Sequence, residues 1–118
     1  MWQKNVALTV YVYKLTASFP ESEKFNLTSQ INRAAVSIAS NIAEGAGRNS
    51  SKEFVRFLSI AHGSCFELET QFIIANKLAY ITDIELEDLL NLINELQRMN
   101  YKLQYTLGNM YNEDIPLK

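Results

Sequence analysis

The sequence has little of what disulfide-linked, metal-binding or membrane proteins need. Among 118 residues it holds one cysteine, Cys65, and one histidine, His62. A single cysteine excludes an internal disulfide and a cysteine-based zinc site, and it favours a reducing, cytoplasmic compartment. No apolar run approaches the roughly 20 residues of a membrane span, and the N-terminus lacks the pattern of a signal peptide.

Charge of one sign is also scarce. Eleven basic residues against 13 acidic ones give a net charge of −2, which argues against a general nucleic-acid binder. An apolar content of 47% with 20% charged residues is typical of a soluble globular protein. A chain of this length can bury one core, so we predict a single domain over residues 1–118.

Proline and glycine are rare, so the chain has few breaks. There are two prolines and four glycines, and the breaks fall at 19–22, 45–49 and 80–82. They divide the chain into four segments of helical length, with no internal repeat. We therefore predict an all-α protein, an antiparallel up-down-up-down four-helix bundle.

The third and fourth segments have the clearest helical patterns. In the third, apolar residues recur at alternating steps of four and three, which predicts left-handed packing at about 20°. These residues are Phe54, Leu58, Ala61, Cys65, Leu68, Phe72, Ala75 and Ala79. The stripe of the fourth is Leu89, Ile93, Leu96, Met99, Leu103, Leu107 and Met110. Ser50 with Glu53 and Thr82 with Glu85 have capping-box spacing and predict where these helices begin.

The second segment combines an apolar stripe with many small side chains. The stripe of the second is Ile31, Ala35, Ile38 and Ile42. Small residues let another backbone come close, and Gly63 in the third segment also predicts a near neighbour.

The first segment is ambiguous. In it Val6, Leu8, Val10 and Val12 alternate as in a strand, whereas Leu8, Val12, Leu15 and Phe19 fit a helix. A lone strand would leave backbone groups unpaired, so we favour the helix.

Polar residues on the second helix form the most distinctive candidate site. Arg33, Ser37, Asn41 and Glu44 share one face beside the apolar stripe. Glu67 and Glu69 of the third helix are candidate acidic partners for Arg33. We interpret the six residues as a hydrogen-bonded seam, either between helices of one chain or between subunits. A ligand or active site is the alternative.

A second candidate site is basic. Arg48, Lys52 and Arg56 form a stripe that runs from a loop into the third helix. Three cations on one face are a possible contact for the phosphate backbone of RNA or DNA, which would be weak and sensitive to salt. A solvated helix face is the plainer interpretation.

Catalytic and metal-binding patterns are weak. Arg56 and His62 have the Arg-x5-His spacing of small all-helical ribonuclease domains. Six residues turn a helix by about 240°, however, so the two side chains should not converge. A di-iron bundle needs Glu-x-x-His on two helices, and one histidine cannot supply it. Gly45-Ala46-Gly47 follows a helix and lacks the Gly-Lys-Ser/Thr of a phosphate loop. We predict no enzyme activity, no metal and no cofactor.

A family resemblance covers nearly the whole chain. Its longest block runs from Arg33 to Gly45, preceded by Phe19-Pro20 and 27–31 and followed by Gly47-Arg48. The match continues through Glu53, Arg56-Phe57-Leu58, Ala61, Gly63-Ser64, Glu67-Leu68-Glu69 and 78–81. These residues resemble the signature of the bacterial 23S rRNA intervening-sequence protein family, which usually has glycine in place of Ala79.

The resemblance implies a four-helix bundle and homo-oligomers, with homopentameric rings as the expected form. In a related branch, the accessory proteins of diversity-generating retroelements, a basic pentamer binds nucleic acid and the reverse transcriptase. This chain departs from that branch, because −2 per subunit becomes about −10 for a ring of five.

The function predicted from the sequence is a non-enzymatic, self-associating interaction or scaffold module of undefined biochemical role. Its protein partner is not identified by any motif. The alternative is an RNA- or DNA-binding accessory protein that acts through a basic face of the ring.

Overall fold

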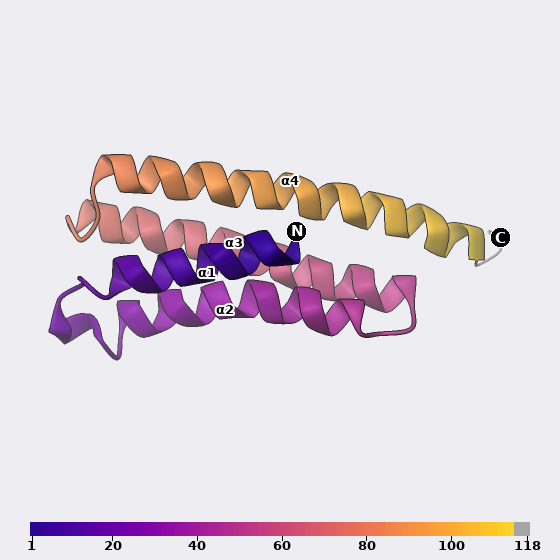
Figure 1. Cartoon of the computed structure of the whole chain (residues 1–118), viewed down its shortest axis with the longest axis horizontal. Helices are drawn as coiled ribbons and strands as arrows, with labels where there is room; N and C mark the ends of the chain where they lie inside the picture. The colour runs from indigo at the N-terminus through magenta and orange to yellow at the C-terminus, as the bar shows by residue number, and fades with distance from the viewer. Residues whose placement is uncertain (115–118) are drawn as a thin grey trace.

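The computed structural model describes residues 1–114, with side chains through residue 109, and within them it contains helices and no strand. The helices are α1 (Trp2–Thr16), α2 (Leu27–Ala46), α3 (Ser51–Lys77) and α4 (Asp83–Asp114), with a short 3-10 helix, η1 (Glu21–Glu23). Successive helices run in opposite directions, which gives an antiparallel four-helix bundle measuring 54 × 24 × 24 Å (Figure 1). The predicted fold class is confirmed.

The ambiguous first segment is a helix, and burial explains why. Leu8, Val12 and Leu15, which share one helical face, are all buried in the core. The strand interpretation placed Val10 on the same face as Leu8 and Val12, but Val10 is 49% exposed. Packing against α2 therefore outweighs the β-propensity of valine and tyrosine in this segment.

The predicted starts of α3 and α4 are confirmed, although only one has the full capping box. At α4 the Glu85 amide donates to Thr82 Oγ1 (3.1 Å), and the Thr82 amide donates to Glu85 Oε1 (2.9 Å). At α3 the Glu53 amide donates to Ser50 Oγ (3.2 Å). The Glu53 carboxylate accepts a hydrogen bond from Arg56 Nε instead.

Helix α3 ends in a Schellman motif that a glycine would suit better. The Tyr80 amide donates to the Ala75 carbonyl and the Ala79 amide to the Asn76 carbonyl, both at 2.9 Å. Ala79 has φ 63°, a left-handed conformation in which a Cβ costs about 1–2 kcal/mol. This backbone geometry gives a physical reason for the glycine expected at Ala79.

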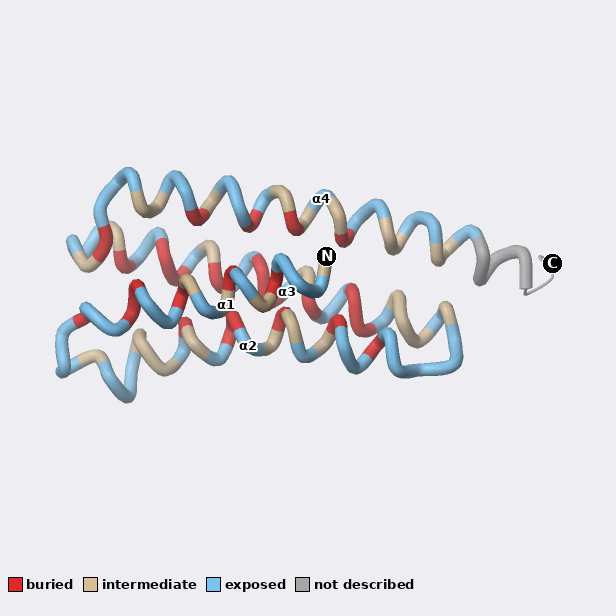
Figure 2. The backbone as a smooth tube through the Cα atoms, in the orientation of Figure 1, coloured by how far each residue is buried: buried red, intermediate tan, exposed pale blue. Residues whose placement is uncertain are grey.

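The core lies where the four helices face one another (Figure 2). The stripe of α2 is buried throughout, and so is that of α3 between Leu58 and Ala75. In α4, Leu89, Ile93 and Leu96 are buried, while Met99, Leu103 and Leu107 are partly buried. Ala79 lies exposed beyond the end of α3, and the Met110 side chain lies outside the described residues.

The helices differ in length, so the bundle has four helices over only part of its long axis. Helix α1 has 15 residues and α4 has 32. The N-terminus lies near the middle of the molecule, and beyond it α2, α3 and α4 continue without α1 (Figure 1). Buried Asn100 joins α4 to α3, because its Nδ2 donates to the Leu58 carbonyl (3.0 Å). None of the described helices is long and apolar enough to cross a membrane.

Two glycines mark opposite kinds of surface. A Cβ on Gly45 would lie 2.8 Å from Phe57 Cβ and 2.9 Å from Phe54 Cδ1, so α2 approaches α3 closely there. Gly63 was expected to have a near neighbour, and within the chain this expectation is wrong. A Cβ on Gly63 would meet nothing within 4 Å, because Gly63 is on the solvent side of α3.

Candidate functional site

The polar line of α2 divides into an inner pair and two outer charges. Ser37 and Ser64 join α2 to α3 through their hydroxyls, whose oxygens lie 3.0 Å apart. Asn41 Nδ2 donates to the Ser37 carbonyl (2.8 Å) and to Ser37 Oγ (3.0 Å). These half-buried groups form a seam inside one chain.

The outer charges lie on the solvent side of that seam. Glu44, near the end of α2, pairs with Nη2 of Arg48 (2.7 Å) in the turn that follows. Arg33 is exposed, and the described residues include no ion pair between it and Glu67 or Glu69. Within the described residues, neither Glu67 nor Glu69 therefore serves as the acidic partner expected for Arg33.

Glu67 and Glu69 lie on opposite flanks of α3. Glu67 accepts a hydrogen bond from Gln71 Nε2, and both follow Ser64 at helical spacing, on the flank beside α2. Glu69 is on the flank beside α4, where it lines a hollow of about 410 Å³. The structure thus brings Glu67, and not Glu69, to the polar line of α2.

The basic stripe gathers around one aromatic ring. The guanidinium carbons of Arg48 and Arg56 lie 5.0 and 4.8 Å from the centre of the Phe57 ring. Each arginine also pairs with a glutamate, Arg48 with Glu44 and Arg56 with Glu53 at 3.2 Å. The sequence did not indicate the contact between Arg48 and Phe57, because only the turn between α2 and α3 brings these two residues together. The third member of the stripe, Lys52, is exposed.

Arg56 and His62 do not converge, as predicted. The Arg56 side chain lies over Phe57, whereas the His62 ring packs edge-on against Phe66, with centroids 5.1 Å apart. In residues 1–109 no group of three or more histidine, cysteine or acidic side chains is placed to hold a metal ion. Burial, followed by the charge of Glu69, raises the pKa of Cys65 to about 12, so its thiol stays protonated at neutral pH.

Helix α3 exposes apolar side chains on the side that faces away from the core. We call this surface the α3 outer face; its large apolar members are Ile60, Phe66, Ile73 and Ile74. Ile60 (43% exposed) and Ile74 (45%) are on the flank that includes Glu67, with Gly63 beside them. The heptad analysis missed this face, because it considered only the stripe with the strongest periodicity.

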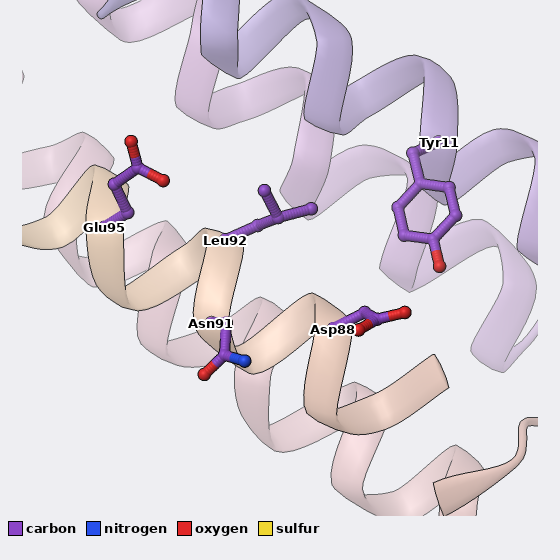
Figure 3. Close-up of a pocket in the computed structure, with 5 residues that line it drawn as sticks. All are labelled: Tyr11, Asp88, Asn91, Leu92 and Glu95. Carbon is purple, nitrogen blue, oxygen red and sulfur yellow. The ribbon is translucent and has the colours of Figure 1, made fainter. Parts of the chain in front are cut away.

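A second candidate surface is the groove between α1 and α4. A hollow of about 450 Å³ is lined by Tyr11, Asp88, Asn91, Leu92 and Glu95 (Figure 3). A neighbouring hollow of about 200 Å³ shares Leu92 and Glu95 with the first. The sequence did not indicate this groove, because it depends on how loosely two helices distant in the sequence pack.

Comparison with known proteins identifies the family. Residues 1–102 match the family described as 23S rRNA-intervening sequence protein. The chain belongs to this family. The matched region of this intervening-sequence protein includes α1, α2 and α3 and the part of α4 that lines the groove. No curated protein matches the chain.

A solved structure supports the same fold for this intervening-sequence protein. The chain is similar to a protein of unknown function from the S23 ribosomal protein family of Bacteroides thetaiotaomicron, known from a crystal structure. The two share 25% sequence identity, with a TM-score of 0.82. The similarity covers 88% of this chain and 94% of the other.

Proposed function

We propose that this protein is a non-enzymatic interaction module that associates with copies of itself through the outer side of α2 and α3. The observation that carries the proposal is the α3 outer face. Helix α3 already buries one side in the core, and it exposes Ile60 and Ile74 on another. A helix that is apolar around much of its circumference is usually surrounded by protein.

A second copy fits this face because the face holds both signs of charge. Arg33 of α2 and Glu67 of α3 lie on the same side of the molecule, and neither forms an ion pair within the described residues. Gly63 lies nearby without a Cβ, so another backbone can approach closely there. Such a face can contact another copy of the chain, and the family resemblance favours a ring of five, in which it would meet a different face of the next copy.

The chemistry of the side chains supports the non-enzymatic part of the proposal. Cys65 is protonated and buried, so it is a poor nucleophile. His62 packs against Phe66, and Arg56 lies on another flank of the same helix. The hollows of about 450, 200 and 410 Å³ have no serine, threonine, cysteine or histidine among the described residues that line them.

The experiment compares two isoleucine substitutions by light scattering after size exclusion. We expect Ile60→Asp to reduce the mass of the wild-type assembly toward the 13.5 kDa of one chain, because it places a charge in the proposed interface. The matched control is Ile84→Asp, at an isoleucine of α4 that is 73% exposed and far from Gly63. A wild-type protein that is monomeric, or an Ile60→Asp protein with the wild-type mass, would contradict the proposal.

Binding of RNA or DNA is a second candidate function, favoured by one observation. Arg48 and Arg56 are held together at one end of the bundle by their contacts with Phe57. Their pairing with Glu44 and Glu53 leaves less charge for phosphate groups. Titration of labelled structured RNA and duplex DNA at low and near-physiological salt tests this function. Binding that is lost when Arg48, Lys52 and Arg56 are all changed to Glu would support it.

A further inference from the structure

The groove between α1 and α4 combines an apolar floor with an acidic rim. Its two hollows, of about 450 and 200 Å³, adjoin along Leu92 and Glu95. Leu8 and Leu96 form part of the floor, and Leu92 is 40% exposed in the groove. The described part of the chain thus leaves an apolar strip between α1 and α4 accessible to another molecule.

The charge of the groove is negative. Asp88 and Glu95 come from one side of α4, and Figure 3 shows the Asp88 carboxylate and the Tyr11 hydroxyl on the same side of Leu92. Lys4 is the cation that lines the groove, and it is paired with Glu95. Within the described residues Asp88 has no ion pair.

The Tyr11 ring lies within the electrostatic field of the Asp88 and Glu85 carboxylates. Burial, followed by the charges of Asp88 and Glu85, raises the pKa of the Tyr11 phenol. An aromatic face beside carboxylates is a combination that holds an ammonium or guanidinium group, through cation–π attraction and charge-assisted hydrogen bonds. The leucine floor next to it suits an apolar side chain one helical turn away.

We propose that the α1–α4 groove binds a cationic, amphipathic helical segment of a partner protein. In this arrangement a lysine or arginine of the segment lies against Tyr11 and Asp88, and a leucine-like side chain covers Leu92. Recognition of an amphipathic helix in a groove is a common mode of peptide binding. The groove is formed by α1 and α4, whereas the proposed self-association surface is on α2 and α3, so the two can be tested with separate variants.

Charge complementarity selects this occupant over a second copy or a nucleic acid. A copy of this chain has a net charge of −2, so it complements an acidic rim less well than a basic segment does. The acidic rim would also repel a phosphate backbone. A basic, amphipathic segment complements both the floor and the rim.

The test uses a fluorescein-labelled amphipathic peptide of leucine and lysine, about 18 residues long so that it spans five helical turns. A matched peptide with glutamate in place of lysine is the charge control. We expect the lysine peptide to bind in an anisotropy titration and to shift the amide resonances of Tyr11 and Leu92. The glutamate peptide should not bind. Equal binding of the two peptides, or no binding of either, overturns the proposal.

Two charge reversals on α4 separate the groove from general electrostatic attraction. Asp88→Lys should weaken binding of the lysine peptide by about tenfold, because an attraction becomes a repulsion. Glu87→Lys makes the same change in net charge at an exposed neighbour that does not line the groove, and it should leave affinity close to that of the wild type. Equal losses in the two variants overturn the proposal.

A mass measurement separates this inference from self-association. If a second copy fills the groove, Asp88→Lys reduces the mass of the assembly, and that result also overturns the proposal. Ile60→Asp, which tests the α2–α3 surface, should leave peptide affinity unchanged. The groove and the proposed self-association can therefore fail independently.

Discussion

The α2–α3 and α1–α4 contacts of the bundle are built in different ways. Where α2 meets α3, small residues let the backbones approach, and a Cβ on Gly45 would already be 2.8 Å from Phe57 Cβ. Hydroxyls of Ser37 and Ser64 join the same two helices. Where α1 meets α4, the larger side chains of Tyr11, Leu92 and Glu95 border hollows of about 450 and 200 Å³.

The difference between these contacts suggests that α2–α3 packing stabilises the monomer, whereas the α1–α4 groove is suited to binding. Close packing gains dispersion energy along the whole contact, so the α2–α3 contact should dominate the stability of the monomer. A loosely packed contact contributes less and leaves apolar surface accessible to a partner. The predictions below test this difference, beginning with the largest expected effect.

Substitution of Gly45 should give the largest loss of stability. Gly45→Ala places a methyl group against Phe54 and Phe57, and we expect it to lower the free energy of unfolding by about 1–3 kcal/mol, as for overpacked cores. Gly63→Ala is the control, because its methyl group meets no atom within 4 Å. It should raise monomer stability by about 1 kcal/mol. Urea unfolding measures both, and a neutral Gly45→Ala would contradict the close contact.

Cys65 should give an intermediate effect that depends on pH. Burial raises its pKa in the folded protein to about 12 from the ordinary value of 9.0, so the unfolded chain loses the thiol proton first. The free energy of unfolding should therefore fall as pH rises from about 9 toward 12. In Cys65→Ala this decline should be smaller.

Alkylation of the same thiol tests whether the core opens locally. Cys65 shares one core cluster with Leu8 and Leu96, which border the α1–α4 groove. We expect iodoacetamide to label Cys65 only under conditions that unfold the whole protein. Rapid labelling at pH 8 without urea would show that the core opens locally.

Removal of the Lys4–Glu95 pair should have the smallest effect. Both side chains are exposed, so Lys4→Ala should change stability much less than Gly45→Ala does, and added salt should remove the difference from wild type. The hydrogen bond from Lys4, followed by its charge, lowers the pKa of Glu95. The contribution of the pair is therefore present above the ordinary pKa of a glutamate and is lost as pH falls through the folded value. If Lys4→Ala lowered the free energy of unfolding as much as Gly45→Ala does, the α1–α4 contact would be as important for stability as the α2–α3 contact.

Much of the fold could be predicted because its signals are local. The stripes of α2 and α3 lie in the core, and Ser50 and Thr82 cap α3 and α4 as expected. Helical periodicity and capping depend on residues three or four positions apart, which the sequence displays directly. Even the ambiguous α1 had Leu8, Val12 and Leu15 among its alternatives, whereas Phe19 is buried but lies beyond the end of the helix.

The candidate sites could be predicted only in part. The sequence grouped Glu67 with Glu69, whereas the structure places them on different flanks of α3. It expected a neighbour at Gly63, which is open within the chain. Phe57 lies beneath two arginines, one of which comes from beyond a turn. The separation of Glu67 and Glu69 follows from helix geometry alone, since two residues turn a helix by about 200°. The surroundings of Gly63 and Phe57 depend instead on how α3 packs against its neighbours.

The four helices, the starts of α3 and α4 and most of the residues that face the core could be predicted from the sequence, because hydrogen bonding and apolar spacing act within a few turns of one chain segment. The close approach of α2 to α3 and the groove between α1 and α4 could be seen only in the packed bundle. That difference depends on the sizes of side chains brought together from distant segments. The fit between them sets both the separation of the helices and the apolar surface left for a partner.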